Sequence, residues 1–316
     1  MIDPKKLELI IEAVHLYYEK GHTQKEIADI LNCSVATVSR LLKEAQEVGV
    51  VEIVIKYPYA VIPSLGQELR QKYNLLNAYV FPTTGVTYYD LVQTLGHTAS
   101  IILDEYLTDN TTLGISLGLS VSATIRAFKG KPRRGCKIVR LQGAVDSEIM
   151  EGTNLSQILA SKIGAEAITI PSPWLLPNEE LRNTMLREAS VAQTLQIAAH
   201  ADIGLVGMGT MEPSYSTILR NKLITLRELN EIRAMGAVGE ICGQHYDING
   251  NLIDHPFQRR IVAVNLESLR NFQCVIGVAA GIHKVDPLIG AINGGFINVV
   301  VTDSDAAREM LDRAEG

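Results

Sequence analysis

Three glycine-rich segments of this 316-residue chain have the composition needed to bind a phosphorylated ligand. Each follows a short apolar run: ISLGLSVSATIRAF (115–128), GLVGMGTM (204–211) and VAAGIHK (278–284). In the first, backbone amides at the start of a helix, aided by Ser120 and Ser122, would form a seat for a phosphate group. In the third, Lys284 follows Gly281 at the end of a predicted strand, where its ammonium could pair with a phosphate or a sugar oxygen.

A carboxylate, Glu240, lies among small and apolar residues in AVGEICGQHYD (237–247). It could accept hydrogen bonds from the hydroxyl groups of a polyol, or it could be an ordinary ion-pair partner. The other features have equally plain alternatives, because Gly and Ser often serve only to turn the chain and a single Lys is usually solvated. The residues alone leave both interpretations open.

Apolar runs alternate with helical stretches from residue 64 onward, with Gly, Ser and Thr at the junctions. The predicted strands are LNAYVFP (76–82), DNTTLGIS (109–116), CKIVRLQ (136–142), AEAITIP (165–171), ADIGLVG (201–207), CVIGVAAG (274–281) and INVVVTD (297–303). They are apolar on both faces, which is typical of strands covered by helices on both sides of a sheet. The predicted fold class is α/β with a Rossmann-like, mainly parallel sheet. Ligands bind at the carboxyl ends of such strands, where the glycine-rich segments lie.

The amino-terminal residues carry the signals of two helices in succession. Apolar residues at three- and four-residue spacing predict the first: Leu7, Ile10, Ile11, Val14 and Tyr17. Gly21 ends it. Thr23 then stands three residues before Glu26, the spacing of a capping box, and opens a second helix through Leu31.

A third helix follows a tight turn at Asn32 and Cys33, with Ser34 placed to cap it. Its inward residues are expected to be Val35, Val38, Leu41 and Leu42. Two short helices joined in this way form a helix-turn-helix, whose second helix enters the major groove of DNA. The predicted DNA-binding residues are the outward ones: Ser34, Ala36, Thr37, Ser39, Arg40 and Lys43.

These outward side chains suit a nucleic-acid interface. Ala36 or Thr37 could contact a thymine methyl group, and Arg40 and Lys43 could reach guanine edges or phosphates. The following strand VVEIVIK (50–56) could serve as a wing, so a winged helix-turn-helix is predicted. The alternative is a helical hairpin that binds no DNA.

The length of the chain and the two prolines that follow the predicted wing strand predict two domains. The helix-turn-helix domain is expected at 1–56, a linker with Pro58 and Pro63 at 57–64, and a larger ligand-binding domain at 65–316. The net charge of −6 argues against a protein that coats nucleic acid nonspecifically. The four cysteines are scattered and predict neither disulfides nor a zinc site. No signal peptide or membrane span is predicted, so a soluble cytoplasmic protein without metal or cofactor is expected.

The order of an amino-terminal helix-turn-helix, AVGEICGQHYDINGNLID (237–254) and IGVAAGIHKVDPLIGAINGGFINVVVTD (276–303) resembles the SorC family of bacterial sugar-metabolism regulators. The resemblance covers essentially the whole chain. It implies an effector domain similar in fold to sugar-phosphate isomerases and deaminases, a homotetramer built as a dimer of dimers, and operator binding that responds to a phosphorylated sugar.

The resemblance also places an effector site on particular residues. The family's phosphate loop falls on Leu117, Gly118, Leu119 and Ser120, where Leu117 and Ser120 replace the usual Trp or Gly and Thr. The sugar-recognising carboxylate falls on Glu240 and the ligand-binding lysine on Lys284. Gly209 and Thr210, in the second glycine-rich segment, complete the expected site.

One position in the resemblance limits the ligand. Some members carry Lys directly after the residues VRL (139–141) and form an imine with the effector, and others carry Arg there to hold a second phosphate; here the residue is Gln142. An amide can do neither. The expectation is therefore an effector that is bound noncovalently and carries at most one phosphate.

The sequence is compatible with three functions. The leading hypothesis is a transcriptional regulator of a carbohydrate-metabolism operon that binds a palindromic or pseudo-palindromic operator and is controlled by a small sugar phosphate. The alternative is a sugar-phosphate isomerase or deaminase with a DNA-binding domain, for which Asp202, Glu240, His245 and His283 are the candidate acids and bases. The third is an oligomerisation scaffold. The residues do not identify the sugar, the sign of regulation, the operator or the operon.

Overall fold

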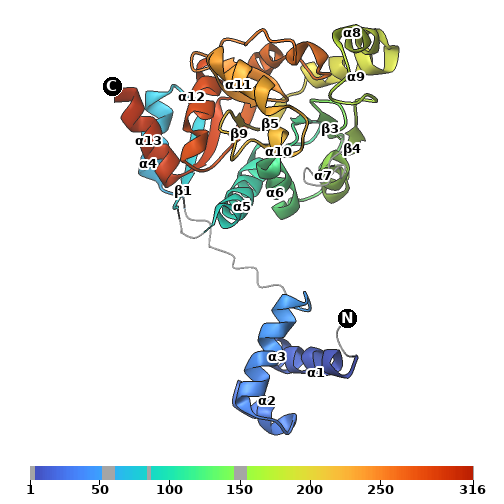
Figure 1. Cartoon of the computed structure of the whole chain (residues 1–316), viewed down its shortest axis with the longest axis vertical. Coiled ribbons are helices and arrows are strands. Elements are labelled where there is room, and N and C mark those ends of the chain that lie inside the picture. The colour runs from blue at the N-terminus through green and yellow to red at the C-terminus, as the bar shows by residue number, and fades with distance from the viewer. Residues whose placement is uncertain (1–3, 52–60, 84–86, 146–154, 316) are drawn as a thin grey trace. The chain divides into compact units, whose positions relative to one another are not determined.

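The computed structural model describes residues 4–51, 61–83, 87–145 and 155–315 (Figure 1). The chain divides into two compact units, Met1–Pro58 and Tyr59–Gly316. Residues 52–56 of the predicted wing strand and residues 57–60 of the predicted linker lie outside the described residues.

The described part of the first unit consists of helices, and two of them start after the predicted caps. Its elements are α1 (Pro4–Val14), a π-helical turn (His15–Glu19), α2 (Gln24–Ile30) and α3 (Val35–Glu47). Thr23 and Glu26 form the reciprocal capping box at α2, and the Ser34 side chain accepts a hydrogen bond from the amide of Thr37 at α3. The α2–turn–α3 arrangement is the predicted helix-turn-helix.

The three helices bury one small core: Ile10, Ala13, Ile27, Ala28, Val38, Leu41, Leu42 and Ala45. Two residues expected in it are instead exposed, Ile11 at 50% and Val35 at 45%. Ile11 lies about 100° around α1 from the buried Ile10, outside the face of the helix that this core covers. Val35 is the first residue of α3, before the helix meets its partners.

All seven predicted strands are found in one parallel sheet of order β1-β10-β9-β5-β2-β3-β4. The strands are β1 (Asn77–Phe81), β2 (Thr112–Ile115), β3 (Lys137–Arg140), β4 (Glu166–Ile168), β5 (Ile203–Gly207), β9 (Cys274–Val278) and β10 (Val299–Asp303). Helices lie on both sides of it (Figure 1). Along β10, Val299 and Val301 pack on one face and Val300 on the other, which explains why the strands are apolar throughout.

The helices of the second unit form the outer layers. On one face pack α4 (Pro63–Lys72), α9 (Ala189–Ala199), α12 (Val285–Asn293) and α13 (Ser304–Glu315). On the other pack α5 (Tyr88–Tyr106), α6 (Leu119–Ala127) and α7 (Leu155–Ile163). The remaining helices are α8 (Glu179–Arg187), α10 (Thr217–Arg220), α11 (Leu226–Ala234) and the short 3-10 turns η2 (Gln258–Arg260), η3 (Leu266–Asn271) and η4 (Ile282–Lys284). Among the residues in Figure 1 that are drawn as ribbon, no helix is long and apolar enough to cross a bilayer.

A second, antiparallel sheet was not expected from the sequence. It consists of β6 (Gly209–Thr210), β7 (Ala237–Ile241) and β8 (Gln244–Asp247), in the order β6-β7-β8. Cys242 and Gly243 make the turn between β7 and β8 with positive φ of 53° and 84°, as a tight hairpin requires. This sheet pairs Glu240 with Gly209, and so brings the carboxylate to the exit of β5.

Candidate functional site

One pocket of the second unit is lined by residues from all three glycine-rich segments. It lies where β2, β5 and β9 end, beside the β7–β8 hairpin. Eight of the nine residues expected to bind the effector line it: Leu117, Gly118, Leu119, Ser120, Gln142, Gly209, Glu240 and Lys284. Thr210 is not among the lining residues; it is buried, and its hydroxyl accepts a hydrogen bond from the amide of Glu212 at 3.2 Å.

The start of α6 forms one end of the pocket. Gly118 precedes the helix with φ of +148°, and no side chain caps the first turn. The amides of that turn have no acceptor within the helix, which makes this end suited to an anion. Ser120 lines the pocket, whereas Ser122 does not, and its hydroxyl accepts a hydrogen bond from Arg126 Nε at 3.4 Å.

Gln142 supports this loop from the neighbouring strand. Its side chain is buried, and its Oε1 accepts a hydrogen bond from the amide of Leu117 at 3.4 Å. The amide of Leu117 is therefore already engaged, while the amides of the first helical turn are left for a ligand.

Lys284 brings a positive charge to the same pocket. The residue is 6% exposed, and its Nζ donates a hydrogen bond to the carbonyl oxygen of Met208 at 2.7 Å. Burial lowers the pKa of the ammonium to about 8, an effect that Glu240 opposes and Arg220 reinforces. Lys284 is therefore a buried cation in a pocket and not the solvated surface lysine that was its alternative.

Glu240 faces the pocket from β7. Its Oε2 accepts a hydrogen bond from the amide of Gly243 at 2.7 Å. Burial raises the pKa of the carboxyl, against the effects of Gly243 and Lys284. A Cβ on Gly209 would lie 2.1 Å from Glu240 Oε1, so only glycine at this position lets the carboxylate occupy its place.

An apolar wall completes the pocket, and the sequence did not reveal it. Its members include Val145, Trp174, Met208 and Ile218, with Tyr88 and Thr217 nearby. The Trp174 indole Nε1 donates to the carbonyl oxygen of Cys242 at 3.0 Å, which leaves its ring as an apolar surface. The one signal in the sequence was that Trp174 is the single tryptophan of the chain.

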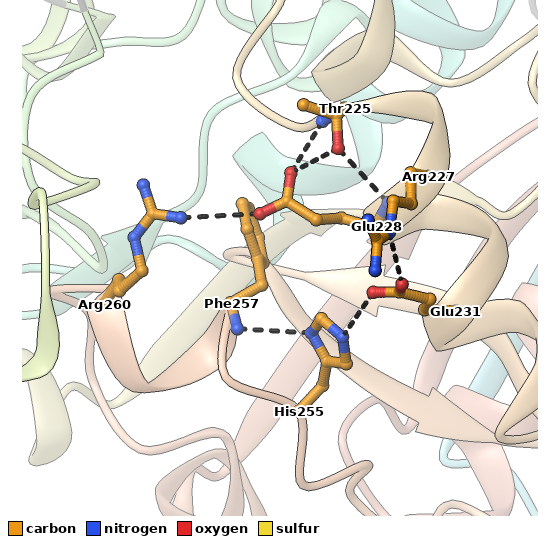
Figure 2. Close-up of polar contacts among 7 residues, drawn as sticks. All are labelled: Thr225, Arg227, Glu228, Glu231, His255, Phe257 and Arg260. Carbon is orange, nitrogen blue, oxygen red and sulfur yellow. Dashed lines mark hydrogen bonds and ion pairs between the residues drawn. The ribbon is translucent and has the colours of Figure 1, made fainter.

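A polar network surrounds Phe257, which contacts Trp174 (Figure 2). Phe257 packs edge-on against Trp174, with ring centroids 6.2 Å apart. The amide of Phe257 donates to His255 Nδ1 at 3.2 Å, and His255 Nε2 faces Glu231 at 3.6 Å. Glu228 completes the cap of α11 at Thr225 and faces Arg260 at 3.5 Å. Phe257, which packs against Trp174, is thus held by a hydrogen bond to His255, and an ion pair between Arg260 and Glu228 lies in the same network.

The candidate acids and bases do not form a catalytic group. Asp202 lies at the amino end of β5, where it accepts a hydrogen bond from the amide of Thr112 at 2.8 Å. His245 is fully buried outside the pocket lining, and burial lowers its pKa to about 3. An aldose–ketose isomerase needs a base and an acid beside the substrate carbonyl, but of the four candidates only Glu240 lines the pocket, and His283, like Asp202 and His245, does not. In the described parts of the chain, no group of three or more His, Cys, Asp or Glu could hold a metal ion.

The first unit presents the predicted reading surface on α3. Ser34, Ala36, Ser39, Arg40 and Lys43 are exposed, and Thr37 is half-buried. The hydroxyls of Ser34 and Thr37 lie 2.8 Å apart and share a hydrogen bond. Except for Thr37, which is partly covered, these side chains are accessible to a large partner.

Each of the two units matches a known protein family. Residues 58–312 match the Sugar-bind family of sugar-binding domains, and residues 12–47 match region 4 of sigma-70 factors. The chain belongs to the SorC family of sugar-binding transcriptional regulators. It is a regulator with a helix-turn-helix and a sugar-binding domain, as the resemblance implied.

Individual relatives cover nearly the whole of this SorC-family chain. The deoxyribonucleoside regulator of Bacillus subtilis is 28% identical over 98% of this chain and 99% of its own. The sorbitol operon regulator of Klebsiella pneumoniae is 28% identical over 96% and 98%, respectively. The crystal structure of that full-length regulator, SorC, superposes with a TM-score of 0.71 at 27% identity, covering 97% of this chain and 99% of SorC.

Proposed function

We propose that this regulator binds operator DNA through α3 and that a small phosphorylated sugar, held noncovalently in the pocket of the second unit, changes its affinity for the operator. The target is a carbohydrate-metabolism operon. The observation that carries the proposal is the meeting of three features in one pocket: the uncapped start of α6, the Lys284 ammonium and the Glu240 carboxylate. The proposed division has DNA binding in residues 1–56, effector binding with oligomerisation in residues 65–316, and a linker at 57–64, whose last two residues, Pro63 and Ser64, lie in α4.

A phosphate fits this pocket better than an uncharged group does. Amides of Leu119 and Ser120 supply hydrogen-bond donors and the positive end of a helix dipole. Lys284 supplies a full positive charge in surroundings from which water is largely excluded. Buried donors of this kind lose hydration when the pocket forms, and an anionic ligand restores their partners.

We assign recognition of the sugar moiety to Glu240, with Gln142 as a support of the loop. Glu240, an acceptor when ionised, suits the hydroxyl groups of a polyol. Gln142 is buried and uncharged, and its oxygen already bonds to Leu117, so it supports neither an imine nor a second phosphate. The proposed effector therefore carries one phosphate and forms no covalent bond with the chain.

The DNA partner is assigned from α3 and from the regulators that resemble this chain. Ser34, Ala36, Thr37, Ser39, Arg40 and Lys43 are the proposed contacts. The proposed assembly is a homotetramer. Paired helix-turn-helix units read half-sites about one helical turn apart or a multiple of it, so the proposed operator is palindromic or pseudo-palindromic.

A thermal-stability screen of the purified protein with sugars and sugar phosphates tests the ligand class. We expect one sugar monophosphate to raise the unfolding midpoint selectively, because a hundredfold excess over Kd stabilises the native state by about 2.7 kcal/mol. A shift with a free sugar and none with phosphates would show that the ligand class is wrong. No shift with any member would favour the scaffold hypothesis.

A further inference from the structure

A buried carboxylate lies under the turn that carries Lys284. Asp303, the last residue of β10, is 0% exposed. Its Oδ1 accepts hydrogen bonds from the amides of Asp305 and Ala306, both at 3.1 Å, and from the hydroxyl of Thr83 at 3.0 Å. Its Oδ2 accepts one from the amide of Gly281 at 2.5 Å. A fully buried carboxylate with four donors is held in one position.

The two oxygens of Asp303 have different roles. Oδ1 binds the first amides of α13, as a helix-capping aspartate does. Oδ2 is not needed for that cap and bonds instead to the chain that leaves β9. A helix cap alone therefore does not explain the placement of this side chain.

The bond from Oδ2 extends the strand pairing toward the pocket. The amide of Ala279 donates to the carbonyl oxygen of Val301 in β10 at 3.2 Å. Two residues further along, the amide of Gly281 also points toward β10 and donates to Asp303 Oδ2. Gly281 then begins the turn η4 with φ of +95°, and its carbonyl accepts the amide of Lys284 at 2.9 Å. A short chain of hydrogen bonds thus links Asp303 to the backbone of Lys284.

The same carboxylate also contacts the segment before α5. The hydroxyl of Thr83 donates to Asp303 Oδ1, and the amide of Thr83 donates to Ser304 Oγ at 3.0 Å. Thr83 lies shortly before Thr87, the cap of α5, and the first residue of α5, Tyr88, lines the pocket. The Tyr88 ring packs against His283 of the same turn, with centroids 5.1 Å apart.

We propose that Asp303 is a positioning residue: its carboxylate fixes the turn from Gly281 to Lys284, and through that turn it sets the place of the Lys284 ammonium in the pocket. The proposal rests on the role assigned to Lys284 above. Asp303 itself does not line the pocket, so it acts on the effector only through the turn.

The test follows Lys284 directly and uses no effector. Trace acetylation of the full-length protein with acetic anhydride, read by peptide mass spectrometry across a pH series, gives the pH at which Lys284 becomes reactive. In the wild type this midpoint is expected near 8, because the amine is buried. In Asp303→Asn, an amide cannot accept hydrogen bonds at both former oxygen positions. The turn loosens, and we expect the midpoint to rise toward the ordinary lysine value by about one pH unit or more.

Two further variants separate positioning from general stability. Asp202→Asn removes a carboxylate that accepts the amide of Thr112 at the opposite end of the sheet, and it should leave the Lys284 midpoint unchanged. Gly281→Ala disturbs the same hydrogen bond from its donor side, since its Cβ would lie 2.8 Å from His283 Cε1 at a strained φ, while the α13 cap stays intact. It should raise the midpoint as Asp303→Asn does.

A wild-type midpoint in folded Asp303→Asn would overturn the proposal and leave Asp303 as a cap of α13 only. If Asp303→Asn does not fold, an unchanged midpoint in Gly281→Ala would overturn it in the same way. Because no sugar phosphate is present, these results do not depend on whether the effector has been assigned correctly.

Discussion

Replacing Lys284 with methionine is expected to leave operator affinity in the absence of effector unchanged and to raise the effector concentration needed for a half-maximal response by about 10- to 150-fold. Methionine is an unbranched side chain that is one heavy atom shorter than lysine and has no ammonium, so the substitution removes a charge-assisted hydrogen bond to phosphate worth about 1.5–3 kcal/mol. The measurement is a titration of effector against a fixed protein–operator complex followed by fluorescence anisotropy.

The pH dependence of the same titration adds an independent check. The pKa of Lys284 is lowered to about 8, so the ammonium is present at pH 7 and is lost as the pH rises through 8. The wild-type response should therefore weaken above pH 8, and that of Lys284→Met should not follow this dependence. Lys72→Ala, at an exposed lysine of α4, serves as the control and should behave as the wild type. An unchanged response in Lys284→Met would exclude Lys284 from the effector site.

Replacing Arg40 with alanine is expected to weaken specific operator binding by about 1–3 kcal/mol if its guanidinium forms a bidentate contact with guanine. Arg40 is exposed on α3 between Ser39 and the buried pair Leu41 and Leu42, so the truncation should not unfold the unit. Operator affinity and affinity for random DNA are measured at one salt concentration, because both depend strongly on salt.

The ratio of the two affinities identifies the contact. A fall in the ratio indicates that Arg40 reads a base, and an equal loss on both DNAs indicates a phosphate contact. Lys20→Ala, at an exposed cation that follows the π-helical turn, should have little effect on the ratio. Unchanged operator affinity in Arg40→Ala would contradict the assignment of this side chain to the reading surface.

The sheet could be predicted because its strands have a clear sequence pattern. Runs such as INVVVTD are apolar on both faces, and a strand buried between two helical layers requires that pattern. The caps Thr23 and Ser34 were equally readable, since a cap depends on residues three positions apart. Strand patterns and helix caps depend on residues close together in the sequence, so the rest of the fold has little effect on them.

The wall of the pocket could not be predicted, because tertiary contacts create it. Trp174 is held by bridges that pair Ala144 with Pro173 and Leu175 with Ile261, residues that lie far apart in the sequence. The β7–β8 hairpin was missed for a related reason: its strands are short, and Cys242–Gly243 is not a typical hairpin turn sequence. In the helix-turn-helix, periodicity placed Val35 and Ile11 inside, where the helix partners do not reach.

The phosphate loop at the start of α6 could be predicted only in part. The glycine- and serine-rich composition predicts ligand binding for Gly118, Ser120 and Ser122 alike. Ser122, however, bonds to Arg126 and does not line the pocket. Residues two apart on a helix lie about 200° apart, so only one of the two serines can face a ligand at the helix start. The composition located the loop and did not decide which hydroxyl it presents.

The decisive measurement is the affinity of the full-length protein for its operator, with and without the sugar monophosphate that stabilises it, and with the matching free sugar. We expect the phosphorylated sugar to change the operator Kd by about 5- to 150-fold, a coupling of about 1–3 kcal/mol, and the free sugar to leave the Kd unchanged. A sugar phosphate that binds without changing the operator Kd, or a free sugar that changes it equally, would show that operator binding is not controlled by a sugar phosphate.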